Sequence, residues 1–151
     1  MLLDWNARIE ARARDGTYPL HYATRRGREF VEALLEQKAS VDAKDTTWQT
    51  PLHWAALTKN KAVIELLVNA HASRSAQDLQ QMTPLHLAAT TGGRACIKSL
   101  IDGSDLEAKE QSQKTPVMLA ALSGHEEAVK FLLEKGAGKG PRTSMAGRHS
   151  I

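Results

Sequence analysis

The chain has 151 residues, of which 42% are hydrophobic and 25% charged, and it carries a formal net charge of +3. This composition is ordinary for a water-soluble protein, and it excludes a chain with too few apolar residues to fold. No stretch approaches the roughly 18 apolar residues of a membrane span, and Asp4 interrupts the place of a signal peptide, so we expect an intracellular protein, in the cytoplasm or the nucleus.

The charge is unevenly distributed along the chain. Residues 1–28 carry six arginines against three acids, residues 29–137 carry eleven basic residues against fourteen acids, and residues 138–151 carry three basic residues and no acid. A dedicated nucleic-acid-binding protein normally shows one continuous basic face. The small and divided charge therefore argues against that class of protein.

Four similar segments recur along the chain at almost constant spacing. They read Tyr18-Pro19-Leu20-His21, Thr50-Pro51-Leu52-His53, Thr83-Pro84-Leu85-His86 and Thr115-Pro116-Val117-Met118, so the prolines are 32, 33 and 32 residues apart. Self-similarity at one fixed period is typical of stacked copies of a small unit. The sequence therefore predicts a repeat protein rather than a single globular core.

Each unit is predicted to hold two short helices joined by a tight break. Proline suits the first helical turn and a preceding threonine can accept a hydrogen bond there, so we expect N-caps at Thr50, Thr83 and Thr115. Alanine pairs at 55–56, 88–89 and 120–121 are expected to let helices pack closely. The second helices have an apolar face at helical spacing and include residues 29–35, 62–67, 95–101 and 128–133. Helices this short need stacking for stability.

The pattern Thr-Pro-Leu-His-x-Ala at this period resembles the ankyrin repeat. The second and third copies match it fully, whereas Tyr18 replaces the threonine of the first copy and Val117-Met118 replace Leu-His in the fourth. The resemblance covers residues 2 to about 137 and implies an all-α solenoid of stacked helix-turn-helix units with hairpin-like turns. We assign residues 1–16 to the tail of a preceding repeat. Four ankyrin repeats follow, at about residues 17–49, 50–82, 83–114 and 115–137. Residues 138–151 are expected to be a disordered basic tail.

Departures from the family pattern carry further expectations. The family's glycine before Thr-Pro occurs here as Gly16, but Trp48, Gln81 and Gln113 stand at that place in later repeats, so we expect looser or differently shaped turns there. Helix ends carry Gly103 and Gly136, and a left-handed cap at the equivalent Lys38 and His71 would cost strain. Because the first residues align with the end of a repeat, we expect a fragment, a short isoform or a truncated gene model of a longer ankyrin protein; the alternative is an end that pairs with another element.

The histidines do not form a metal or catalytic pattern. His21, His53 and His86 occupy one repeat position and are too widely spaced to share a metal ion; the resemblance implies that they tie the turn to the helix by hydrogen bonds. The other histidines have no ligands at zinc spacing; they are His71, His125 and His149. No nucleophile elbow, phosphate-binding loop or His-Glu-x-x-His motif occurs, so we expect no enzyme, cofactor or metal. Cys96 lies in an apolar run and is predicted to be a buried thiol.

The resemblance implies a protein-binding surface made of the turn tips and the inner side of each first helix. By register, the expected contact residues are Arg12, Arg14, Arg25, Arg26, Thr46, Thr47, Trp48, Leu57, Leu79, Gln80, Met82, Thr90, Gln111 and Lys114. Trp48 either anchors a partner or packs against the neighbouring turn, and Trp54 is expected in the core. The four arginines either receive an acidic segment or form a solvated edge.

These observations favour a non-catalytic interaction module, an adaptor or scaffold, that binds a protein of unknown identity and no small-molecule substrate. The alternative is a structural or regulatory ankyrin segment of a larger polypeptide, such as a channel, kinase or ubiquitin-ligase subunit. A third option, binding of an anionic surface through the basic ends, predicts steep salt dependence, and the acidic middle of the chain opposes it.

Overall fold

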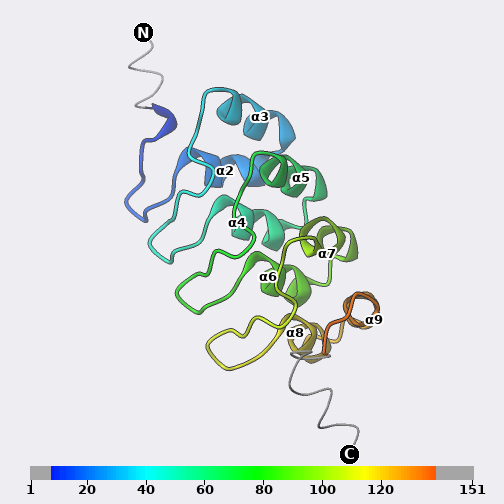
Figure 1. Cartoon of the computed structure of the whole chain (residues 1–151). Helices are drawn as coiled ribbons and strands as arrows, with labels where there is room; N and C mark the ends of the chain where they lie inside the picture. The colour runs from blue at the N-terminus through cyan, green and yellow to red at the C-terminus, as the bar shows by residue number, and fades with distance from the viewer. Residues whose placement is uncertain (1–7, 139–151) are drawn as a thin grey trace, which may run out of the picture.

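A computed structural model describes residues 8–138 of the chain, and within that range the secondary structure consists of eight α-helices and loops. The helices form two layers, and Figure 1 shows long loops that project to one side of both. The first layer, here called the inner helices, comprises α2 (Pro19–Arg26), α4 (Pro51–Thr58), α6 (Pro84–Thr91) and α8 (Pro116–Leu122). The second layer, the outer helices, comprises α3 (Arg28–Glu36), α5 (Lys61–Asn69), α7 (Arg94–Ile101) and α9 (Glu126–Glu134).

The inner helices begin at the repeated prolines, as predicted. The predicted caps Thr50 and Thr83 accept a hydrogen bond from the backbone N–H of His53 (3.4 Å) and of His86 (3.3 Å). Thr115 is also the N-cap residue of its helix, but the expected side-chain bond is missing, because its hydroxyl oxygen is buried without a hydrogen-bond partner. In repeats 2 and 3 the histidine ring also contacts the threonine hydroxyl, and Met118 offers no ring nitrogen to hold the Thr115 hydroxyl in place.

The core runs continuously between the two layers. Ala55, Ala56, Ala88 and Ala89 are fully buried, as small residues at close helix contacts should be. The same prediction fails at Ala121, which is exposed because no further helix of the described residues covers that side of α8. The inner helices pack against one another more closely than the outer helices do, so the inner side of the stack is the concave one. From the outer layer, the core receives Val31, Ile64, Ile97 and Leu132.

The loops before the inner helices, here called fingers 1 to 4, share one turn; they span residues 11–18, 43–50, 76–83 and 108–115. In finger 2, Asp45 N–H donates to Gln49 O (3.0 Å) and Trp48 N–H donates to Asp45 O (3.0 Å), and the other fingers repeat this pair of bonds. The turn residue has positive φ in all four fingers: 81° at Gly16, 67° at Trp48, 64° at Gln81 and 68° at Gln113. The expectation of looser or different turns is therefore wrong.

Gly16 differs from its counterparts in the space around it. A Cβ atom added at Gly16 would lie 2.6 Å from the backbone nitrogen of Thr46 in the next finger, which real Cβ atoms do not tolerate. Finger 1 therefore requires glycine for steric reasons, whereas the other fingers only bear the conformational cost of a side chain at positive φ. The left-handed helix ends at Lys38 (φ 69°) and His71 (φ 67°) match that at Gly103 (φ 80°), as expected.

Candidate functional site

A buried carboxylate organises each of fingers 2, 3 and 4. Asp45 Oδ1 accepts hydrogen bonds from the backbone N–H groups of Thr47 and Gln49, both at 2.9 Å. Equivalent pairs of bonds reach Asp78 and Glu110 in the next two fingers. Burial acts to raise the pKa of Asp45, but hydrogen bonds from Thr47, Gln49 and Trp54 outweigh it and hold that pKa below its ordinary value. Sequence reasoning missed these acids, although each stands six residues before a repeat proline.

Backbone hydrogen bonds join neighbouring fingers into one row. Thr46 donates to Asp15 O from its backbone N–H (3.3 Å) and from its hydroxyl (2.8 Å). Further along, Leu79 N–H donates to Thr47 O (3.0 Å) and Gln111 N–H donates to Gln80 O (2.9 Å). The predicted tip residues are therefore carried by a connected row rather than by separate loops.

Three histidines connect each repeat to the next finger. In His53, Nδ1 accepts the backbone N–H of Thr50 (3.1 Å), which leaves Nε2–H to donate to Met82 O (2.8 Å). His21 and His86 make the equivalent bonds to Gln49 O (2.8 Å) and Lys114 O (3.1 Å). Burial lowers the pKa of all three rings, so they are neutral. The structural role implied for these histidines is confirmed.

Trp54 lies on the concave side of the stack and is only half-buried, so its predicted core position is wrong. Its Nε1–H donates to Asp45 Oδ2 (3.2 Å), which holds the ring at the base of finger 2. The ring meets the edge of His21 (centroids 5.2 Å apart) and of Tyr22 (5.9 Å). The Arg25 guanidinium lies over its face, with Cζ 4.3 Å from the centroid. This cluster exists because the inner helices have no further layer above them.

Two hollows adjoin on this side of the molecule. One, of about 90 Å³, is lined by Arg25, Gln49, Trp54, Leu57 and Thr58. The other, of about 280 Å³, lies at fingers 2 and 3 and is lined by Thr47, Gln49, Asp78, Leu79 and Gln80. Gln49 belongs to both hollows. The inner helices and the fingers therefore enclose a continuous recessed surface, here called the inner face.

A family model of ankyrin repeats (three copies) matches residues 1–78 and 59–143. The chain belongs to the ankyrin-repeat family. Ankyrin repeats generally mediate protein–protein interactions and are generally non-catalytic. A search of curated proteins found no match. Among residues 8–138, no helix of this ankyrin array is long and apolar enough to cross a membrane, and no three His, Cys, Asp or Glu side chains are grouped to hold a metal ion.

The ankyrin array presents most of the predicted contact residues to solvent. Three of them, Met82, Thr90 and Lys114, are half-buried, and the remaining eleven are exposed. Trp48 is 53% exposed, and Lys44 of its own finger lies over the ring, with Nζ 5.0 Å from the centroid. Sequence reasoning missed Tyr22, which is exposed beside Trp54; an aromatic residue at the same helical position in two successive repeats was the available signal.

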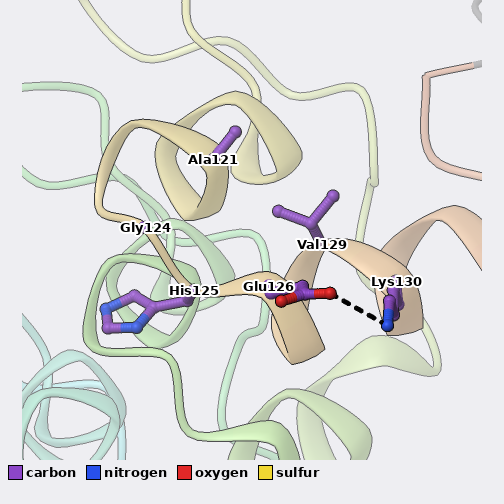
Figure 2. Close-up of a pocket in the computed structure, with 6 residues that line it drawn as sticks. All are labelled: Ala121, Gly124, His125, Glu126, Val129 and Lys130. Carbon is purple, nitrogen blue, oxygen red and sulfur yellow. Dashed lines mark ion pairs between the residues drawn. The ribbon is translucent and has the colours of Figure 1, made fainter.

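A further hollow, of about 440 Å³, lies at the α8–α9 end of the array (Figure 2) and is lined by Ala121, Gly124, His125, Glu126, Val129 and Lys130. Lys130 Nζ pairs with Glu126 Oε1 at 3.0 Å. One repeat earlier, the equivalent glycine, Gly92, is covered: a Cβ there would lie 2.5 Å from the His125 ring, and His125 Nε2 donates to Thr90 O (2.9 Å). This hollow thus corresponds to a packing contact between repeats, and its residues form no catalytic arrangement.

Proposed function

We infer that this ankyrin array is an adaptor or scaffold module that binds a protein partner through its inner face and finger tips. The observation that carries this inference is a group of exposed apolar side chains around the two joined hollows: Tyr22, Trp48, Leu57 and Leu79 are 45% to 57% exposed. Single exposed apolar residues are common on soluble proteins. A group of them beside a recess is typical of a binding surface.

The rigidity of the inner face supports the same function. Its fingers are joined by backbone hydrogen bonds, and buried carboxylates and histidines fix their turns. A surface that is already ordered loses little conformational entropy when a partner binds. The contact residues are therefore held by a framework suited to recognition.

Trp48 supplies a third line of support. Its φ of 67° places a bulky side chain in a conformation that glycine adopts at lower cost. The ring is largely exposed, so local packing returns little of that cost. Retention of tryptophan is explained if the ring anchors a partner, because aromatic anchors dominate many interfaces.

Site-specific photo-cross-linking tests this function. A photoreactive amino acid is placed at Leu57 or Leu79 on the inner face, and at the exposed Lys98 on outer helix α7 as a matched control. We expect protein adducts from the two inner-face positions and none from position 98. Adducts formed only at position 98, or at none of the three positions, would contradict the proposal.

A structural or regulatory segment of a larger polypeptide is the second candidate. It is favoured by exposed apolar side chains on α8 and α9, where Met118, Leu122 and Leu133 are 49% to 72% exposed. Such a segment should tolerate Trp48→Ala and Arg25→Glu without losing any partner. Leu133→Ser should weaken its contact with the rest of the larger polypeptide. A recognition module should show the reverse pattern in a binding assay.

A further inference from the structure

We propose that the inner face of repeats 1 and 2 binds an acidic segment of the protein partner, with one apolar side chain of that segment seated beside Trp54. This proposal rests on the proposed function and names the chemistry of the partner. Two features restrict the ligand in different ways: the exposed arginines of finger 1 and α2, and a hollow to which Arg25 itself contributes a wall.

Four exposed arginines supply the cations: Arg12 and Arg14 in finger 1, and Arg25 and Arg26 in the last turn of α2. The ion pairs formed within residues 8–138 join Arg28 to Glu32, Lys61 to Glu65, and Lys130 to Glu126 and Glu127. None of the four arginines takes part in these pairs. Arg12 Nε already donates to Gly16 O (3.3 Å), but the other N–H groups of these arginines form no ion pair within residues 8–138. They can therefore meet carboxylates, which guanidinium groups bind in a planar, bidentate geometry.

The nearby carboxylates are engaged in the folding of the fingers. Asp45 Oδ1 accepts hydrogen bonds from two backbone N–H groups and the Thr47 hydroxyl, while Oδ2 accepts the Trp54 indole N–H. Asp15 Oδ1 accepts the backbone N–H of Thr17 (3.0 Å). Asp45 is fixed by its own hydrogen bonds and is not free to turn toward the arginines, and none of the ion pairs within residues 8–138 joins Asp15 to an arginine. A ligand must supply the carboxylates that the arginines lack.

Arg25 is held in place before any ligand binds. Its guanidinium stacks on Trp54 at 4.3 Å, and Trp54 is itself fixed by Asp45. A stacked guanidinium keeps its edge N–H groups directed away from the ring, where a carboxylate can meet them. The arrangement lowers the entropic cost of forming the ion pair.

The hollow beside Arg25 has room for an apolar group between Trp54 and Leu57, and its other walls are polar. Its volume of about 90 Å³ is that of about three water molecules, enough for one aliphatic side chain. Trp54 and Leu57 provide apolar walls, and Gln49 leads onward to the hollow at Leu79. An extended segment can therefore place an apolar residue here and continue across fingers 2 and 3.

The direction of the segment follows from the differences between repeats. The helical position of Arg25 is occupied by leucine or threonine in the later repeats, at Leu57, Thr90 and Leu122. Only the repeat 1 side therefore combines cations with the aromatic cluster. The acidic residues should face finger 1 and the end of α2, and the apolar residue should lie between α2 and α4.

A protein segment fits this surface better than a nucleic acid. Nucleic-acid binding needs cations that follow several successive phosphates. Here the four exposed arginines belong to finger 1 and α2, the exposed Asp15 follows Arg14 directly in finger 1, and the face continues into the apolar residues Leu57 and Leu79. The mixture of positive charge and apolar surface matches an acidic peptide.

Selection from a displayed library of random short peptides tests the proposal. The full chain is the target, and enriched peptides are then measured by fluorescence anisotropy against the wild type and three variants. These variants are Arg25→Gln/Arg26→Gln, Leu57→Ser, and Lys98→Gln on the outer layer as the matched control. All four side chains are exposed, so the variants should keep their helical circular dichroism.

We expect enriched peptides with an excess of Asp and Glu around one apolar residue. The double arginine variant should weaken the affinity for these peptides about tenfold. Leu57→Ser should weaken it about fivefold, and Lys98→Gln should leave it unchanged. An Arg25→Glu/Arg26→Glu variant should bind the same peptides once their acids are replaced by lysine. This charge reversal would show direct pairing rather than an indirect effect on folding.

Other outcomes separate the two proposals. Peptides that are sensitive to Leu57→Ser but have no acidic excess would overturn the acidic partner and leave the proposed function standing. Peptides that are insensitive to every inner-face variant, or no enrichment, would overturn both. A single-stranded oligonucleotide that binds more tightly than the peptides, and is lost in the double arginine variant, would also overturn the acidic partner.

Discussion

Repeats 2 and 3 hold their helices differently from repeat 4. In the two central repeats the threonine caps its helix, and the fully buried histidine bonds both to that cap and to the following finger. In repeat 4 the Thr115 hydroxyl has no partner, and Met118 occupies the histidine position with half of its surface exposed. The helix pair nevertheless forms in all three repeats.

This difference shows that forming the helix pair and connecting it to the next repeat depend on different residues of the motif. Proline and the spacing of apolar residues, which every repeat shares, are sufficient for the helix pair. The histidine ring bonds to its own threonine cap and also connects a repeat to its successor, and the second bond forms only where a following finger offers a carbonyl group. In a linear array, stability is approximately a sum of such nearest-neighbour contacts.

Acidification should give the largest effect, because it acts on all three bridging histidines together. Their folded pKa values are lowered below 6.5, so the unfolded chain takes up protons more readily and the free energy of unfolding falls as the pH drops below about 6.5. Each histidine contributes at most about 1.4 kcal/mol per pH unit. Urea denaturation at about pH 7 and about pH 5 measures this loss, and equal midpoints would contradict it. Asp45 adds to the loss of stability only at lower pH, because its folded pKa is lowered from 3.8 and its carboxylate must be protonated before its hydrogen bonds are lost.

Substitution of a single central histidine should be the next largest effect. His53→Ala removes a fully buried ring, leaves the N–H of Thr50 without a partner and removes one of the two hydrogen bonds to the carbonyl of Met82, at a cost of about 3 kcal/mol. Met118→Ala at the equivalent place in repeat 4 should cost about 1 kcal/mol or less, because that side chain is half exposed. Urea denaturation of both variants checks the contrast. Equal losses would mean that the network adds nothing to repeats 2 and 3.

Removal of the finger carboxylates should give an intermediate effect. Asp78→Ala leaves two backbone N–H groups unpaired and also removes the acceptor for Gln49 Nε2 (3.2 Å), at a cost of about 2 kcal/mol. Glu110→Ala removes only bonds within its own finger and should cost about 1 kcal/mol. Chemical denaturation gives both values. A larger loss from Glu110→Ala would reverse the proposed order.

Introduction of the missing histidine should produce the smallest change, a gain. In Met118→His the imidazole can accept the backbone N–H of Thr115 and contact its hydroxyl, as in the central repeats, and should stabilise the chain by about 0.5 kcal/mol. Leu122→His, on an exposed position of the same helix, is the control and should give no gain. Thermal denaturation measures both variants. Destabilisation by Met118→His would show that the network depends on a following finger.

Much of the array could be predicted because its signals are local. The period, the helix starts at the prolines and the outer helices follow from residue spacing, and the structural role of the histidines follows from the family pattern. Cys96 is a buried thiol, and burial raises its pKa, as the apolar run around it indicated. Exposure of most contact residues also followed from register, because each repeat directs the same positions outward.

The sequence by itself determined the repeat, its helices and the positions that the fingers carry, because these depend on neighbours a few residues apart. Tertiary structure decided the rest. The turns at Trp48, Gln81 and Gln113 keep the shape of Gly16 because backbone bonds to fingers about thirty residues away, together with a buried acid within each finger, outweigh the cost of positive φ. Ala121 is exposed because of the place of α8 in the stack. Trp54 lies on the inner face because Asp45 of finger 2 and Arg25 of helix α2 hold its ring there.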